Sequence, residues 1–187
     1  MLLAYLGPED LNRYHAFSRP LRKQQFLLGR MLLRVALSTE LGIPADDIRL
    51  IGLQASSPRL ILPDTVKATP GFCVAHSGNY VSCALDMEGA IGLDVEIMNP
   101  GRDFMAISRL AFSPDEYALL YATPEAERKK MFYQIWTKKE ALYKLNVFEQ
   151  RELFPGAFYQ ICTQKEGHFR FFSFPQENLM VTLCCRQ

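Results

Sequence analysis

The sequence has no excess of charge of one sign and no long hydrophobic run, and each absence excludes a class of protein. Lysine and arginine number 21 against 20 aspartate and glutamate, which gives a net charge of +1. This balance lacks the strongly basic character of a dedicated nucleic-acid binder. No uninterrupted apolar run approaches the ~20 residues that a membrane-spanning helix needs. We therefore expect neither a nucleic-acid partner nor a membrane association.

Cysteine is scarce and its spacing is not that of a structural site. The five cysteines form no Cys-x-x-Cys pair and have no histidine nearby at zinc-finger spacing. Neither a disulfide framework nor a zinc site is therefore expected. Residues 1–6 are apolar but lack a basic region, and Gly7 and Pro8 follow them. This start predicts a first strand and a turn rather than a signal peptide, in a cytoplasmic protein.

Three common enzyme signatures are also missing. The chain has no Gly-rich phosphate loop of the Walker type, no dinucleotide-binding fingerprint and no Gly-x-Ser-x-Gly elbow. What is present is the composition of a globular protein, with 49% hydrophobic and 22% charged residues. A length of 187 residues suits one large domain or two small halves that share a core.

Hydrophobic periodicity predicts two successive blocks, each with helix first and strands after it. A helix is predicted over residues 21–41, followed by short strands at 48–53, 60–62, 72–75, 80–85 and 90–97. Further helices are predicted near 104–112, from Ser113 onward, and from Thr123 to about Leu145, followed by strands at 158–163, 169–174 and 179–184. This order predicts a pseudo-duplicated α+β fold, with an N-terminal half at 1–98 and a C-terminal half at 99–187.

A pair of acidic residues lies in the segment 91–97. Ile91, Leu93, Val95 and Ile97 alternate with polar positions, so a strand here places Asp94 and Glu96 together on the opposite face. Two like charges this close repel each other, and they are tolerated at a solvated edge or where a divalent cation neutralises them. The segment alone favours the solvated edge strand by about two to one.

Two more segments carry side chains suited to chemistry. Glu140 and Lys144 are four residues apart and share one face of a helix rich in aromatic residues, which implies burial. A surface Glu–Lys pair would have the same spacing. His76 lies in the polar stretch 76–79 between two predicted strands, in a turn that could present a ligand contact or a proton acceptor. A turn histidine without a role is the alternative.

Taken in order, three motifs resemble the signatures of the 4'-phosphopantetheinyl transferase superfamily. They are His76-Ser77-Gly78, Gly92-Leu93-Asp94-Val95-Glu96 and Trp136-Thr137-Lys138-Lys139-Glu140-Ala141-Leu142-Tyr143-Lys144. The helix at 26–34 also looks like the N-terminal segment of that family. The length is similar to that of the monomeric, pseudo-dimeric branch, which includes the surfactin-synthetase activator, so the resemblance implies a monomer with its active site between the halves.

The resemblance implies an enzyme that uses coenzyme A and Mg²⁺. Such an enzyme transfers 4'-phosphopantetheine to a serine of an apo acyl or peptidyl carrier protein and releases adenosine 3',5'-bisphosphate. By similarity, Asp94, Glu96 and Glu140 would hold Mg²⁺, and Asp94, Glu140 and Lys144 would be catalytic. Lys144 would reach the pyrophosphate and stabilise developing charge or relay the serine proton.

The coenzyme would be bound by cationic and imidazole groups. His76 resembles the family histidine that contacts the phosphates of coenzyme A, together with Lys144, and the candidates for its 3'-phosphate are Arg19, Arg22 and Arg59. Glu116 corresponds to a family acid near the metal site, but it also completes a capping box with Ser113, which we favour slightly.

Some positions depart from the family pattern and leave alternatives open. Residues 56–59 read Ser-Ser-Pro-Arg where the family has Gly-Lys-Pro or Gly-Arg-Pro, and Ala75 stands where a serine is frequent. These departures keep open a non-catalytic module that binds coenzyme A or a carrier protein. The acidic cluster alone would also serve a metal-dependent phosphodiester hydrolase. A basic rim for an acidic carrier is predicted at Lys129, Lys130, Lys138 and Lys139.

Overall fold

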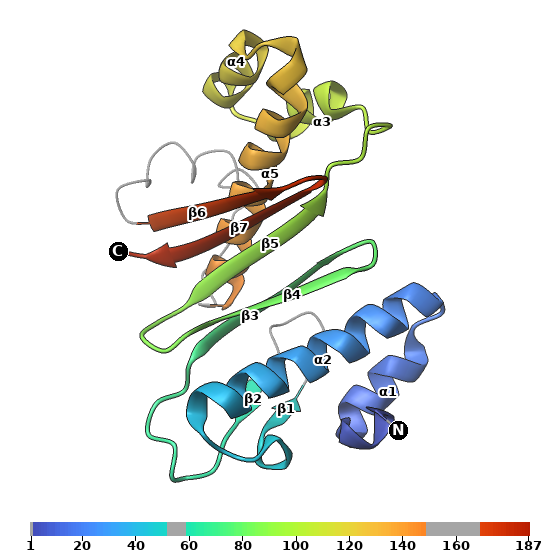
Figure 1. Ribbon diagram of the computed structural model, residues 1–187, viewed down its shortest axis with the longest axis vertical. Coiled ribbons are helices and arrows are strands. Elements are labelled where there is room, and N and C mark those ends of the chain that lie inside the picture. The colour runs from blue at the N-terminus through green and yellow to red at the C-terminus, as the bar shows by residue number, and fades with distance from the viewer. Residues whose placement is uncertain (1, 52–58, 149–168) are drawn as a thin grey trace. The chain divides into compact units, whose positions relative to one another are not determined.

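The computed structural model describes residues 2–51, 59–148 and 169–187 of an α+β protein (Figure 1). The chain divides into two compact units, unit 1 over Met1–Ile91 and unit 2 over Gly92–Gln187. Unit 1 combines helices with two separate two-stranded sheets, and unit 2 combines helices with one three-stranded sheet. Within the described ranges, no helix has the length and apolar character needed to cross a membrane.

Unit 1 is built on one long helix. Its elements are the 3-10 turn η1 (Leu2–Tyr5), α1 (Pro8–Ala16), α2 (Pro20–Leu41), the 3-10 turn η2 (Ala45–Asp47), β1 (Arg49–Ile51), β2 (Arg59–Ile61), β3 (Gly71–Ser77) and β4 (Tyr80–Asp86). Helix α2 ends as predicted at Gly42, whose φ of 65° suits a left-handed helix cap. Strands β1 and β2 pair with each other, as do β3 and β4, and α2 packs on β3 and β4.

The expectation of a first strand is wrong. Residues Leu2–Tyr5 form a 3-10 turn, and α1 follows from Pro8 to Ala16. Pro8 occupies a first-turn position, where a missing N–H costs nothing, and Glu9 and Asp10 place negative charge at the positive end of the helix. Asp10 is buried, and its Oδ1 accepts a hydrogen bond of 3.0 Å from Nη2 of Arg30 in α2. The two residues also form an ion pair, in which Arg30 Nε lies 2.8 Å from Asp10 Oδ2. This buried ion pair joins α1 to α2.

Unit 2 has a three-stranded sheet covered by a long helix (Figure 1). Its elements are β5 (Ile91–Ile97), α3 (Phe104–Ala111), α4 (Pro114–Ala122), α5 (Glu125–Phe148), β6 (Phe169–Gln176) and β7 (Leu179–Arg186). The strand order is β5-β7-β6, and α5 packs mainly on the central strand β7. The helices and all but one of the strands predicted for this part of the chain are confirmed. The strand predicted at 158–163 lies outside the described residues.

The helix starts in unit 2 follow their capping residues. The side chain of Asp103 accepts a hydrogen bond from the Ala106 N–H at 3.0 Å at the start of α3. Ser113 and Glu116 form the predicted capping box, in which the Ser113 N–H donates to Glu116 Oε2 at 2.8 Å. The Glu116 N–H donates to Ser113 Oγ at 3.3 Å in return.

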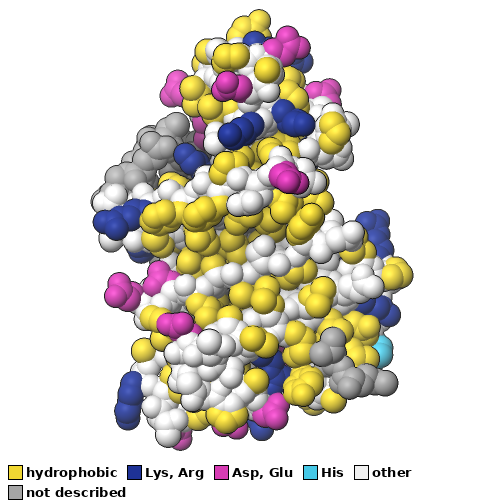
Figure 2. All heavy atoms as spheres, viewed as in Figure 1, with side chains coloured by type: hydrophobic (Ala, Val, Ile, Leu, Met, Phe, Trp, Pro, Cys, Tyr) yellow, Lys and Arg dark blue, Asp and Glu magenta, His cyan; other side chains and the backbone are white. Residues whose placement is uncertain are grey.

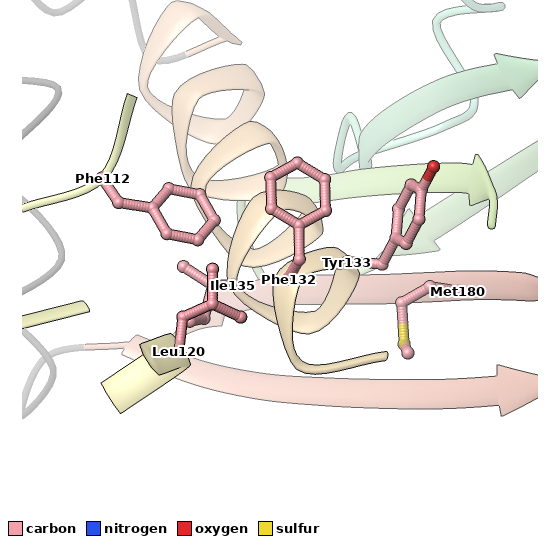
Figure 3. Close-up of a cluster of buried hydrophobic side chains, with 6 residues drawn as sticks. All are labelled: Phe112, Leu120, Phe132, Tyr133, Ile135 and Met180. Carbon is pink, nitrogen blue, oxygen red and sulfur yellow. The ribbon is translucent and has the colours of Figure 1, made fainter. Parts of the chain in front are cut away.

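Aromatic side chains dominate the core of unit 2 (Figure 3). The cluster consists of Phe112, Leu120, Phe132, Tyr133, Ile135 and Met180. Phe132 and Phe112 stack with their centroids 5.3 Å apart, and the Tyr133 hydroxyl accepts the Asn99 N–H at 3.0 Å. Such aromatic contacts add about 0.5 to 1.5 kcal/mol each beyond the burial of their area. The cluster therefore fixes α3 and α4 against the first half of α5.

The β5-β7-β6 sheet of unit 2 has one polar strip and one apolar side. Buried Thr182 of β7 shares a hydrogen bond of 2.7 Å with Thr137 of α5 and another of 3.0 Å with Ser173 of β6. Hydrophobic side chains gather over the sheet in Figure 2. Phe172 and Phe174 of β6 are exposed. Thr182 therefore connects three elements on the side that carries α5.

Candidate functional site

The acidic strand β5 lies directly against α5. A Cβ placed on Gly92 would be 1.9 Å from the Ala141 carbonyl oxygen and 3.0 Å from the Cβ of Leu145. Only glycine permits this approach, because any side chain would overlap the helix backbone. The close approach brings the polar side of β5 to the turn of α5 that carries Glu140 and Lys144.

Asp94 and Lys144 form the centre of the candidate site. The Lys144 ammonium donates to Asp94 Oδ1 at 2.6 Å, and Asp94 is only 5% exposed. Asp94 Oδ2 is buried and has no hydrogen-bond partner among the described residues. The interpretation of Asp94 as part of a solvated edge is therefore wrong, because Asp94 points at the helix and is out of water.

Two carboxyl groups of this site, Asp94 and Glu140, have a raised pKa. Burial is the largest cause and raises the pKa of Asp94 to about 6, Lys144 opposes the rise, and Glu96 and Glu140 add to it. Burial, with a contribution from Glu96, also raises the pKa of Glu140 above its ordinary value, while Lys144 lowers it. Repulsion from Glu96 therefore contributes to the raised pKa of both Asp94 and Glu140, in line with the like-charge argument from the sequence.

The carboxylate oxygens of Asp94, Glu96 and Glu140 are the type of ligand that a hard divalent cation prefers. An unsatisfied buried carboxylate oxygen, two carboxyl groups with raised pKa and a third acid nearby are what Mg²⁺ would stabilise. Across the described residues, no three His, Cys, Asp or Glu side chains converge closely enough to form a metal-binding group. In this arrangement the positive charge beside Asp94 comes from Lys144, and Glu96 lies 3.9 Å from Arg102.

Glu116 is held by other partners. Besides its role in the capping box, its Oε2 accepts a hydrogen bond of 2.7 Å from the Lys139 ammonium. The Lys139 side chain is 1% exposed. Lys139 therefore cannot belong to the solvent-facing basic rim predicted from the sequence, whereas Lys130 is exposed and Lys129 and Lys138 are partly exposed. The error arises because Lys139 turns inward to a carboxylate of another helix.

His76 and Arg22 come together in unit 1. Arg22 Nη1 lies 2.6 Å from His76 Nε2, although the two residues are 54 positions apart. A guanidinium can only donate, so this contact requires the imidazole Nε2 to accept and the ring proton to sit on Nδ1. His76 belongs to strand β3, opposite Val81, so its placement in the turn is wrong. The turn itself is Gly78-Asn79, where Gly78 has a φ of 53°.

The environment of Arg22 is crowded with positive charge. Burial and the charge of Arg13 lower the pKa of Arg22. The sequence analysis did not select Arg13, which lies on α1 with its guanidinium over the Phe26 ring. The sequence analysis predicted a strand and a turn at the start of the chain and no helix at 8–16, so nothing placed Arg13 near Arg22. Two neighbouring guanidinium groups and an imidazole can together accept an anion such as a phosphate.

The other residues predicted to bind coenzyme A lie at exposed positions of unit 1. Arg19 is exposed at the N-cap of α2, three residues before Arg22, and Arg59 is exposed on the short strand β2. Residues 56–58, where the sequence departs from the family pattern, lie outside the described residues. Ala75 is 2% exposed in the core, so a hydroxyl at this position would be buried.

A cavity of about 560 Å³ lies elsewhere in unit 1. It is lined by the N-terminal segment, by Asp10, Arg30 and Arg34, and by residues of β1. None of the predicted site residues is among the described residues that line it. Within unit 1, this cavity is therefore distinct from the group formed by Arg22 and His76.

The region around the Asp94 site matches a known family. A family model for the 4'-phosphopantetheinyl transferase superfamily matches residues 90–183, about half of the chain. The chain belongs to the 4'-phosphopantetheinyl transferase superfamily. The matched region contains Asp94, Glu96, Glu140 and Lys144, so the motif resemblance found in the sequence is confirmed.

Named relatives agree with this membership of the superfamily. The chain is 33% identical over 145 residues to the 4'-phosphopantetheinyl transferase HetI of Nostoc, a match that covers 76% of this chain and 60% of HetI. It is 30% identical over 142 residues to the 4'-phosphopantetheinyl transferase Sfp of Bacillus subtilis, covering 76% of this chain and 60% of Sfp. Against the 4'-phosphopantetheinyl transferase AcpT of Escherichia coli K12 the identity is 31% over 123 residues, covering 66% of this chain and 57% of AcpT. The chain thus spans less than two thirds of the length of these relatives.

Proposed function

We propose that this chain is a 4'-phosphopantetheinyl transferase, which moves 4'-phosphopantetheine from coenzyme A to a serine of an apo acyl or peptidyl carrier protein. The reaction would depend on Mg²⁺ and release adenosine 3',5'-bisphosphate. The observation that carries the proposal is the buried Asp94–Lys144 pair beside Glu140, within the region that matches the superfamily. All of the carboxylates and the lysine expected from the motifs are present.

The proposal includes the finer features of the sequence analysis. These are the pseudo-duplicated fold, the division into halves at 1–98 and 99–187, a monomeric state and a cytoplasmic location. The carrier protein partner and coenzyme A as co-substrate belong to it as well. Two units of similar size, each with helices and an antiparallel sheet, support the pseudo-duplication.

The residues of unit 2 would act on the pyrophosphate. Asp94, Glu96 and Glu140 would hold Mg²⁺, which when bound supplies positive charge to the pyrophosphate oxygens. Lys144 would exchange part of its contact with Asp94 for a phosphate oxygen, because an ammonium group donates three hydrogen bonds. Its positive charge would then stabilise the charge that develops on the leaving group.

The residues of unit 1 would bind the coenzyme. Arg22 and His76 present a guanidinium and an imidazole within 2.6 Å of each other, and a phosphate oxygen could accept hydrogen bonds from both after His76 shifts its proton or gains one. Arg13 adds positive charge to the same neighbourhood. Arg19 and Arg59 are exposed and remain candidates for the 3'-phosphate.

Intact-protein mass spectrometry tests the proposal directly. An apo carrier protein is incubated with this chain, coenzyme A and Mg²⁺, with and without a chelator. We expect the carrier to gain the mass of one phosphopantetheine group, and to gain none when the chelator is present. No gain with fatty-acid, polyketide or peptide synthetase carriers would contradict the proposal. Release of free phosphopantetheine without a labelled carrier would instead indicate a hydrolase.

A further inference from the structure

The least expected charged residue of unit 2 is Lys139. Its side chain is 1% exposed, although it stands in a run of charged residues on α5. Its ammonium donates to Glu116 Oε2 at 2.7 Å and lies 5.8 Å from the centroid of the Phe112 ring. A buried ion pair of this kind gains little stability over apolar side chains of similar volume, because both charges lose their hydration. Stability alone therefore does not explain why a lysine is here.

The Glu116 carboxylate is bonded to its own helix start as well as to Lys139. The same oxygen that receives the Lys139 ammonium also accepts the Ser113 N–H at 2.8 Å, and the Glu116 N–H donates to Ser113 Oγ. The carboxylate is thereby fixed to the first turn of α4. Lys139 is thus joined to a rigid helix start, and Glu116 is occupied in that role.

Lys139 directly precedes Glu140 along α5. Neighbouring residues on an α-helix are separated by about 100° around the axis, so Lys139 faces α4 while Glu140 faces another direction. The helix is also held at the next residue, where the backbone of Ala141 lies against Gly92 of β5. The Gly92 contact sets how close the helix lies to the strand. The first half of α5 is also held by the buried side chains of Phe132, Tyr133 and Ile135. Lys139 adds an ion pair to these contacts directly beside Glu140.

We propose that Lys139 is a positioning residue: its ion pair with Glu116, added to the core contacts of α5, sets the rotation of the helix beside Glu140, and so the direction in which Glu140 and Lys144 point toward Asp94. This proposal rests on the proposed function for its effect on catalysis. It also assigns Glu116 to holding the helix rather than to binding a metal ion. A shift of a reacting group by about 1 Å can cost on the order of a hundredfold in rate, so a small rotation of α5 would be felt in turnover.

Trp136 provides a readout that does not depend on activity. It is the only tryptophan of the chain and lies on α5 one turn before Glu140. Its ring stacks at 5.9 Å from the Phe132 ring and lies 5.5 Å from the Arg102 guanidinium. A rotation of α5 would change these neighbours, and with them the emission wavelength of Trp136 and its quenching by acrylamide.

The experiment compares four proteins: wild type, Lys139→Met, the double variant Glu116→Gln with Lys139→Met, and Lys67→Met as a matched control. Lys67 is exposed in the loop before β3, far in sequence from α5. We measure the emission of Trp136, unfolding in denaturant, the Kd for coenzyme A, and kcat for carrier labelling. Lys139→Met is expected to shift the emission and to lower kcat at least tenfold, with the Kd for coenzyme A changed by less than twofold. The Lys67→Met protein should match wild type throughout.

The double variant separates positioning from stability. It removes both charges, so it is expected to fold even if Lys139→Met alone does not. If the pair only stabilises the fold, the double variant regains wild-type kcat and wild-type emission, which would overturn the proposal. If the pair positions α5, the double variant is stable and still has a shifted emission and a low kcat. Should the wild type label no carrier at all, the proposed function fails, and the Trp136 emission still decides whether Lys139 sets the rotation of α5.

Discussion

Gly92 and Ala141 approach so closely that a β-carbon on Gly92 would lie 1.9 Å from the Ala141 carbonyl oxygen. We expect Gly92→Ala to lower the free energy of unfolding by about 3 kcal/mol, because the overlap is with backbone and neither partner can rotate away. Unfolding in urea, followed by circular dichroism, would measure the loss. The variant should also lose carrier labelling, since α5 would have to move away from Asp94.

Gly89→Ala is the matched control for this change. A β-carbon at Gly89 would meet no atom within 4 Å. We expect its free energy of unfolding to stay within about 0.5 kcal/mol of wild type. Equal stability of the Gly92→Ala and Gly89→Ala proteins would show that β5 and α5 are not in contact at Gly92.

The ionisation of Asp94 should make the metal-free protein less stable as the pH rises. The pKa of Asp94 is about 6 in the folded chain against an ordinary value of 3.8, so between these values the folded state holds more protons than the unfolded state. Stability therefore falls with rising pH across this window, by up to about 3 kcal/mol from this group. Denaturant unfolding at pH 4 and pH 7.5, in the presence of a chelator, would measure the change.

Asp94→Asn isolates this contribution from other titrating groups. The amide does not ionise, so the variant should gain stability relative to wild type as the pH rises from 4 to 7.5. Addition of Mg²⁺ at pH 7.5 should stabilise wild type but not Asp94→Asn if the carboxylate is a metal ligand. A difference between the two proteins that stays constant with pH would contradict the raised pKa.

The sequence correctly predicted the local features of the candidate site. The alternation in 91–97 correctly placed Asp94 and Glu96 on the polar side of a strand, and the spacing of Glu140 and Lys144 correctly placed both on one helix face. Ser113 and Glu116 were correctly interpreted as a capping box, because that motif is local. Each of these predictions depends only on a short stretch of neighbouring residues.

The contacts that were missed all join residues far apart in the chain. Lys144 reaches Asp94 across 50 positions, and Lys139 reaches Glu116 across 23. Nothing in the run of charges on α5 distinguishes the buried Lys139 from the partly exposed Lys138 and Glu140, because the difference comes from the helix that packs against it. The first helix was missed for a related reason, since its buried Asp10 depends on Arg30 of α2.

Removal of Lys144 should leave Asp94 without its only described ionic partner. We expect Lys144→Met to cost on the order of 2 kcal/mol at pH 8, because a buried carboxylate is then unpaired. At pH 4, below the pKa of Asp94, the carboxyl is neutral and the loss should be much smaller. The measurement is the difference in unfolding free energy from wild type at the two pH values.

The double variant Asp94→Asn with Lys144→Met provides the control for that experiment. It removes both charges, so its stability should exceed that of Lys144→Met alone at pH 8. An equal cost of Lys144→Met at both pH values would mean that the lysine contributes by packing and not through Asp94.

Arg22 and His76 should be needed mainly to bind the coenzyme. We expect Arg22→Ala to raise the Kd for coenzyme A about tenfold at low salt, with a smaller effect at high salt because ions screen the lost charge. His76→Ala should weaken binding as well, through loss of the imidazole next to Arg22. Calorimetric titration with coenzyme A at two salt concentrations would measure both effects.

Arg49→Ala is a suitable control, since Arg49 is an exposed arginine on β1 of the same unit. It should leave the Kd for coenzyme A unchanged. A loss of kcat in Arg22→Ala with an unchanged Kd at both salt concentrations would remove Arg22 from the binding site.

The hydroxyl groups of Thr137, Thr182 and Ser173 limit how β6 can pair with β7. Ser173 lies directly opposite Thr182 in the ladder, and Thr182 in turn meets Thr137 of α5. If β6 slipped by two residues, Phe171 or Pro175 would stand opposite Thr182, and a buried hydroxyl would lose a partner at a cost of about 1 to 3 kcal/mol. Apolar neighbours alone would tolerate such sliding. These hydroxyl groups therefore favour one pairing register of β6 with β7. Through Thr137 they also favour one position on the sheet for α5, the helix that carries Glu140.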